Sequence, residues 1–167
     1  MKSYILRWLF RLNVSKSTLI ITLLSSPWLV SLFLKDTGIA TAILWAYTAV
    51  GYFFISFLLL LFLKLISTMR KSEVRKRLVT FARVYIRFHV ASALLGVYSL
   101  YFHVSYMLDS GWVKTSVGLA GVLALIGLAG VLFTGYLRKQ KSSGRRRRYH
   151  RYFAYVFVAS TILHMVL

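Results

Sequence analysis

The sequence predicts an all-α integral membrane protein in which residues 1–167 form a single domain of five transmembrane helices. Two observations support this prediction. Hydrophobic residues make up 59% of the 167 positions and charged residues only 15%, whereas a soluble domain has about 25% charged residues. The charges are also unbalanced, with 22 Lys and Arg against 3 Asp and Glu, and they lie between long apolar stretches. The 16% aromatic content excludes a disordered chain.

Five stretches of the chain are apolar and long enough to be considered as spans, since about 20 residues of helix cross the hydrocarbon core. In lipid the backbone must satisfy its own hydrogen bonds, so these stretches should be helical. The last charge-free stretch is short, and we extend it back to Tyr149, with Arg151 reaching to the headgroups. In chain order the expected helices cover residues 17–34, 37–63, 84–108, 115–137 and 149–167.

The cations predict the orientation of these helices. All but two of them precede residue 17 or lie in residues 64–87 and 138–151, and only Lys35 and Lys114 fall on the other side. By the positive-inside rule, the N-terminus is cytoplasmic and the C-terminus is outside. A basic start before an apolar run is also typical of a cleaved signal. The length of the run, and the lack of a clear cleavage site after it, favour an uncleaved first helix.

The strong positive charge has two interpretations. The run Arg145–Arg148 invites a nucleic-acid interpretation. These cations flank membrane spans, however, where they fix topology and contact anionic headgroups, so we expect lipids as partners and no nucleic acid. The chain has no cysteine, which excludes disulfides, thiolate metal sites, iron–sulfur clusters and covalently attached c-type haem.

Four histidines carry the strongest functional signal. His89 and His103 belong to the third expected helix, and His150 and His164 to the fifth; the members of each pair are 14 positions apart. Fourteen residues are 40° short of four full turns and rise about 21 Å, so both rings of a pair lie on one helix face. Both helices start on the cytoplasmic side. His89 and His150 are therefore expected at an inner level, and His103 and His164 at an outer level.

Two opposed histidines at each level suit haem iron better than a free metal ion. A zinc site would need further ligands that the membrane segments do not supply. Haem iron needs only two axial ligands, which gives two noncovalent b-type haems, one held by His89 and His150 and the other by His103 and His164. The alternative is that each histidine makes an ordinary interhelical hydrogen bond.

Five more residues are candidate cofactor-binding positions. Gly96 lies midway between His89 and His103 and leaves that helix face bare, which would suit a macrocycle or simple close packing. Ser99 and Ser160 each precede an outer histidine by four residues, where the hydroxyl or carbonyl could orient the ring. Arg87 and Arg151 are expected to pair with propionates. The glycine-rich fourth helix is interpreted as a packing partner.

This arrangement resembles the ferric reductase-like transmembrane domain of ferric reductases, NADPH oxidases and the haem-bearing membrane subunit of the bacterial periplasmic methionine sulfoxide reductase system. The resemblance rests on His89 and His103 with thirteen residues between them, and on Arg148-Tyr149-His150-Arg151 followed by thirteen residues and His164. It covers residues 83–167. It implies two stacked haems that carry electrons across the membrane, with these four histidines as ligands.

Two differences from that family bear on the partners. Its members usually have a sixth helix, and many have a cytoplasmic domain for flavin and NADPH, whereas this sequence ends three residues after His164 and has no dinucleotide fingerprint or P-loop. We therefore expect a separate donor, which would be a flavoprotein, a soluble reductase or a quinol. Respiratory cytochrome b spaces its histidines similarly, so the family stays open.

The resulting expectation is a transmembrane electron-transfer protein, or the membrane subunit of an oxidoreductase, in a prokaryotic plasma membrane. It would pass electrons from a cytoplasmic or quinol donor to an outer-side acceptor. One alternative is a non-redox scaffold or assembly protein with structural histidines. Another is an incomplete redox unit that borrows a subunit for its quinone site.

Overall fold

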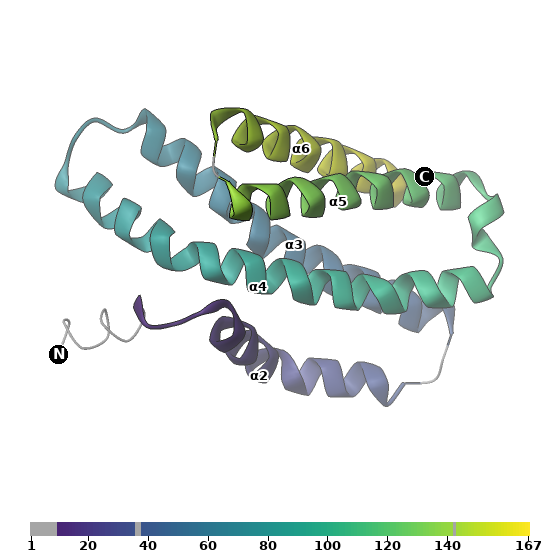
Figure 1. Ribbon diagram of the computed structural model, residues 1–167. Helices are drawn as coiled ribbons and strands as arrows, with labels where there is room; N and C mark the ends of the chain where they lie inside the picture. The colour runs from purple at the N-terminus through teal and green to yellow at the C-terminus, as the bar shows by residue number, and fades with distance from the viewer. Residues whose placement is uncertain (1–9, 36–37, 142) are drawn as a thin grey trace. The chain divides into compact units, whose positions relative to one another are not determined.

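A computed structural model of the chain describes residues 10–35, 38–141 and 143–167 (Figure 1). The chain divides into two compact units, Met1–Tyr106 and Met107–Leu167, and each unit is described by itself below. All regular secondary structure in the described ranges is helical, which confirms the all-α prediction. The elements are α2 (Val14–Phe33), α3 (Ile39–Thr68), α4 (Glu73–Asp109), the short 3₁₀ helix η1 (Trp112–Lys114), α5 (Ser116–Gln140) and α6 (Gly144–Val166).

Several helices are longer than the apolar stretches that predict them. The predicted starts at residues 84 and 149 are wrong, because α4 begins at Glu73 and α6 at Gly144. Lys and Arg are good helix formers, so the basic flanks continue the helices beyond their apolar parts. Serine caps set the new starts: the Ser72 hydroxyl accepts a hydrogen bond from the backbone N–H of Arg75, and the Ser143 hydroxyl from that of Arg146, both at 3.2 Å.

Four helices within the described residues are long and apolar enough to cross a membrane, namely α2, α3, α4 and α5. Many large apolar side chains on these helices are exposed, as a lipid-facing surface requires. The last helix, α6, is long enough but begins with the arginine run, which lowers its hydropathy. Its role as a fifth span therefore stays a prediction.

In the first unit, the apolar core consists of two clusters at opposite ends of the α3–α4 pair. At one end, Trp45 of α3 stacks on Phe102 of α4, with ring centroids 4.6 Å apart, and contacts Leu29 and Leu32 of α2. At the other end, Leu59 and Ile66 of α3 pack with Ala82 of α4. The contact of His89 with Ser56 lies between these clusters, and the contact of His103 with Ala42 lies just beyond the Trp45–Phe102 stack.

The second unit is a pair of antiparallel helices, α5 and α6, preceded by η1. Gly127 of α5 lies so close to α6 that a Cβ on it would be 3.1 Å from the Cα of Phe157. This contact supports the interpretation of the glycine-rich helix as a close-packing partner. Gly111, just before η1, has a φ of 72°, a left-handed conformation that favours glycine.

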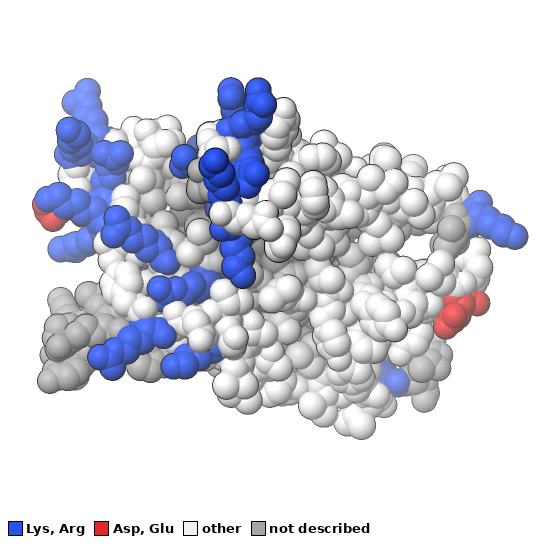
Figure 2. Space-filling model, in the orientation of Figure 1, with Lys and Arg blue, Asp and Glu red and all other residues white. Residues whose placement is uncertain are grey.

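In each unit, Lys and Arg side chains are concentrated at one end of the helices. Figure 2 shows them around the junction of α3 and α4 and, in the second unit, over the first turns of α6. The arginines of α6 follow its N-cap directly. The segregation of charge seen in the sequence is thus also present in each folded unit, at the helix ends nearest His89 and His150.

Candidate functional site

The two histidines of α4 both contact backbone carbonyls of α3. The Nδ1 atom of His89 lies 2.7 Å from the carbonyl oxygen of Ser56 and 2.8 Å from its hydroxyl oxygen. The Nδ1 atom of His103 lies 2.9 Å from the carbonyl oxygen of Ala42. Both imidazoles are half-buried, whereas Ala42 and Ser56 are buried.

The two histidines of α6 repeat this arrangement against α5. The Nδ1 atom of His150 lies 3.1 Å from the carbonyl oxygen of Val131 and 3.3 Å from the hydroxyl oxygen of Thr134. The Nδ1 atom of His164 lies 2.9 Å from the carbonyl oxygen of Val117. Each unit therefore holds two histidines on one helix, both bonded to the helix that precedes it.

The acceptors are spaced like the histidines. Ala42 and Ser56 are 14 positions apart on α3, and Val117 and Val131 are 14 positions apart on α5. The later histidine of each helix bonds the earlier acceptor, as expected for two antiparallel helices in a fixed register. Sequence reasoning found the histidine spacing and missed the matching spacing of the acceptors, because a backbone carbonyl leaves no signature in residue type.

These bonds assign the ring protons. A carbonyl oxygen can only accept, so each Nδ1 must donate. In the neutral ring the lone pair is then on Nε2, which is the arrangement in metal-ligating histidines, whose second ring nitrogen bonds a carbonyl or carboxylate. All four histidines thus have the form that a haem ligand would need, and four such nitrogens would suffice for two haems.

Glycines on α5 make room for the α6 imidazoles. A Cβ on Gly121 would lie 3.1 Å from Cε1 and 3.3 Å from Nδ1 of His164, and one on Gly135 would lie 3.4 Å from Cε1 of His150. Each glycine is four residues after an acceptor, Val117 or Val131. A larger residue at that position would place its side chain over the acceptor carbonyl. These glycines were expected only to pack helices, although their own spacing of 14 residues matches that of the histidines.

The orienting role expected of Ser99 and Ser160 falls to other groups. The Nδ1 atoms of His103 and His164 bond the carbonyls of Ala42 and Val117 instead. Both serines are buried, at 1% and 6% exposure. The Ser99 hydroxyl has no hydrogen-bond partner within the described part of the chain. Ser99 and Ser160 therefore do not orient the histidine rings through Nδ1. Their assignment to a cofactor site stays a prediction.

Gly96 has an aromatic neighbour within its own unit. A Cβ on Gly96 would lie 2.8 Å from Cε1 of Phe53 on α3. The bare backbone between the two histidines of α4 is therefore used for close helix packing, which is the second of the two roles expected for it. Its contribution to a cofactor site stays a prediction.

Of the two arginines expected to pair with propionates, Arg87 has a partner in the described chain. Its guanidinium donates a 3.0 Å hydrogen bond to the carbonyl of Phe10, and Arg151 is exposed on α6. Another arginine, Arg146, donates to the carbonyl of Leu137 at 2.6 Å and so caps the C-terminal end of α5. A propionate role for Arg87 and Arg151 stays a prediction.

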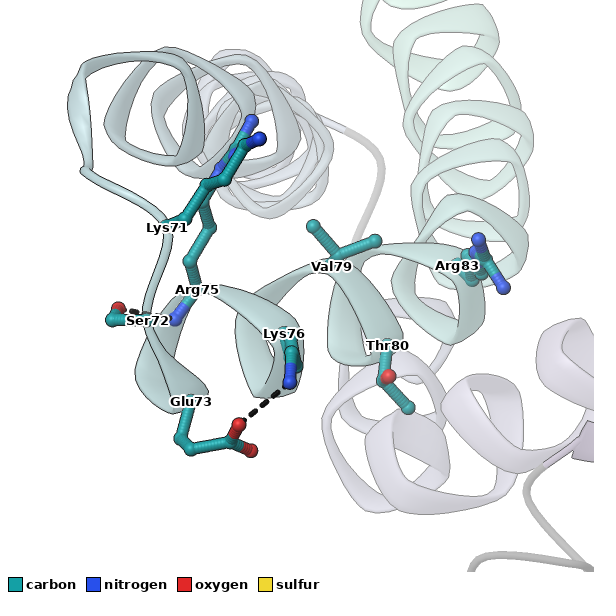
Figure 3. A pocket seen from close by; sticks show the side chains of 8 residues that line it. All are labelled: Lys71, Ser72, Glu73, Arg75, Lys76, Val79, Thr80 and Arg83. Carbon is teal, nitrogen blue, oxygen red and sulfur yellow. Dashed lines mark hydrogen bonds and ion pairs between the residues drawn. The ribbon is translucent and has the colours of Figure 1, made fainter.

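A basic pocket of about 550 Å³ lies at the start of α4, apart from the histidines (Figure 3). Its acid, Glu73, forms a 2.6 Å ion pair with Lys76, and the side chains of Lys71 and Arg75 extend together on another side. This pocket fits the expected contact of basic loops with anionic headgroups. Its lining residues are Lys71, Ser72, Glu73, Arg75, Lys76, Val79, Thr80 and Arg83.

Comparison with known proteins does not assign the chain to a family. No family model matches the chain, and neither curated proteins nor solved structures give a match. Within the described residues, no group of three or more His, Cys, Asp or Glu is placed to hold a metal ion. The candidate site thus consists of the four histidines and the carbonyls that they contact.

Proposed function

We propose that the chain is a membrane-embedded b-type cytochrome that holds two noncovalent haems and passes single electrons across the membrane. One haem would be held by His89 and His150, and the other by His103 and His164. The observation that carries the proposal is the set of four Nδ1 bonds to backbone carbonyls, two in each unit and 14 residues apart in both. They support the tautomer in which the lone pair is on Nε2, which would then ligate the iron.

The topology in this proposal has five spans, a cytoplasmic N-terminus and the C-terminus outside. The fifth span is the part of α6 from Tyr149 onward, with Arg151 at the headgroup level. His89 and His150 then lie near the cytoplasmic face, where Lys and Arg are concentrated. Electrons would enter there from a separate flavoprotein, soluble reductase or quinol and leave to an acceptor on the outer side.

A reduced-minus-oxidised visible spectrum with a pyridine haemochrome count tests this proposal directly. Protein purified in detergent from cells well supplied with haem should contain two b-type haems per chain. His103→Ala and His164→Ala should each remove one haem. Tyr101→Ala and Ile162→Ala, at exposed positions of the same two helices, should retain both. A colourless wild-type protein, correctly folded and monodisperse, would refute the proposal.

The same four bonds favour a second candidate, in which the histidines only join neighbouring helices of a non-redox scaffold or assembly protein. Interhelical hydrogen bonds contribute about 0.6–2 kcal/mol each in membranes. In that case His103→Ala and His164→Ala would lower the unfolding temperature without any change in absorbance, because no haem would be present in the wild type. The haem count therefore separates the two candidates.

A further inference from the structure

The two histidines within each unit differ in their side-chain hydrogen bonds. In the first unit the Ser56 hydroxyl oxygen lies 2.8 Å from Nδ1 of His89, and in the second unit the Thr134 hydroxyl oxygen lies 3.3 Å from Nδ1 of His150. These contacts are additional to the carbonyl bonds of the same Nδ1 atoms. Each unit therefore has one such hydroxyl, beside the first of its two histidines in the sequence.

At the second histidine of each unit, His103 or His164, the residue types rule out the same contact. Fourteen positions before Ser56 on α3 is Ala42, and fourteen positions before Thr134 on α5 is Ala120. Both alanines are buried, at 0% and 7% exposure. A methyl side chain has no oxygen to accept a hydrogen bond. The helix repeat that places Ser56 and Thr134 at the histidines thus places methyl groups at the equivalent positions beside His103 and His164.

The two hydroxyls act as acceptors toward the imidazoles. The Ser56 hydroxyl donates its own hydrogen to the carbonyl of His89 at 3.1 Å, and the Thr134 hydroxyl donates to the carbonyl of Gly130 at 2.7 Å. Each oxygen therefore directs a lone pair at the Nδ1–H group. A second acceptor on Nδ1–H makes the ring a stronger base at Nε2, which is how such partners tune a ligated metal.

We propose that Ser56 and Thr134 lower the reduction potential of the haem held by His89 and His150 below that of the haem held by His103 and His164. This inference rests on the proposed function. A more basic axial ligand stabilises ferric over ferrous iron, and hydrogen bonding around the ligands is one of the factors that set haem potentials. With both haems bound, this difference would favour the transfer of one electron from the haem of His89 and His150, which would be oxidised, to the haem of His103 and His164, which would be reduced. A flavin or quinol would supply the electron.

The test is an equilibrium redox titration of the purified holoprotein, followed by its visible absorbance. Ser56→Ala and Thr134→Val should each raise the lower of two midpoint potentials and leave the upper one unchanged, and the double variant should show the larger shift. Thr161→Val is the matched control, because its hydroxyl bonds the carbonyl of Phe157 on α6. This control should leave both potentials unchanged.

The reciprocal substitutions keep the test independent of any loss of folding. Ala42→Ser and Ala120→Thr add a hydroxyl at the equivalent positions and should lower the upper potential while the lower one stays in place. Combining them with Ser56→Ala and Thr134→Val should reverse the order of the two haems. The haem count of each variant shows that it has folded.

Failure of this inference differs from failure of the proposed function. If the variants hold two haems and neither midpoint potential moves, or the lower one falls, the roles of Ser56 and Thr134 are refuted and the cytochrome proposal stands. If the wild-type protein binds no haem, both are refuted.

Discussion

Gly121 on α5 faces the imidazole of His164 on α6 so closely that a Cβ on the glycine would lie 3.1 Å from Cε1 of the ring. The carbonyl that holds this ring, from Val117, is one helical turn earlier and lies 2.9 Å from Nδ1. In an α-helix that carbonyl also accepts the backbone N–H four residues on, which is that of Gly121. A glycine at this position therefore gives the ring access to a carbonyl that a side chain would cover.

Gly121→Leu should displace His164 from the Val117 carbonyl, because its side chain would occupy the space of the ring. We expect loss of one of two haems, measured by the pyridine haemochrome count. Gly51→Ala is the control, since a Cβ there meets nothing within 4 Å, and it should retain both haems. Retention of two haems with an unchanged spectrum in Gly121→Leu would show that this glycine has no part in placing the ligand.

Gly96→Val should destabilise the first unit through overpacking. A Cβ at this position would lie 2.8 Å from Cε1 of Phe53, so the phenylalanine ring must move. Overpacking of this kind costs about 1–3 kcal/mol, which should appear as a lower thermal unfolding temperature in detergent. Combining it with Phe53→Ala should restore part of the loss, and an equal loss with and without Phe53 would contradict the contact.

Gly111→Ala should destabilise the turn before η1. Gly111 has a φ of 72°, and a left-handed conformation costs about 1–2 kcal/mol for a residue with a Cβ. Gly38→Ala is a matched control, because Gly38 also precedes a helix but has an extended φ of −164° and open space around it. Thermal unfolding should show a loss for Gly111→Ala alone, and equal unfolding temperatures for the two variants would contradict the prediction.

Single cysteines should report the sidedness of the loops without background, because the chain has no cysteine of its own. In intact cells, a membrane-impermeant maleimide should label Ser110→Cys and leave Lys71→Cys and Lys141→Cys unlabelled until the cells are opened. This result follows from the proposed topology, in which the positive-inside rule assigns the cation-rich helix ends to the cytoplasm. Labelling of Lys71→Cys in intact cells would reverse the proposed direction of electron transfer.

The sequence by itself determined the helical class, the apolar spans and the shared face of each histidine pair, because apolar length and the 3.6-residue repeat are properties of a single helix. It placed helix starts less well at residues 73 and 144, where basic residues prolong a helix and a serine cap sets its first turn. The fifth span, the haems and the partners stay predictions.

Only the tertiary structure decided which groups hold the imidazoles. Backbone carbonyls of Ala42, Ser56, Val117 and Val131 are common to every residue type, so no pattern of side chains identifies them in advance. Their role depends on the register of two antiparallel helices, which the packing of both helices sets together. The roles of Gly121 and Gly135, and the hydroxyls beside only two of the four rings, became visible for the same reason.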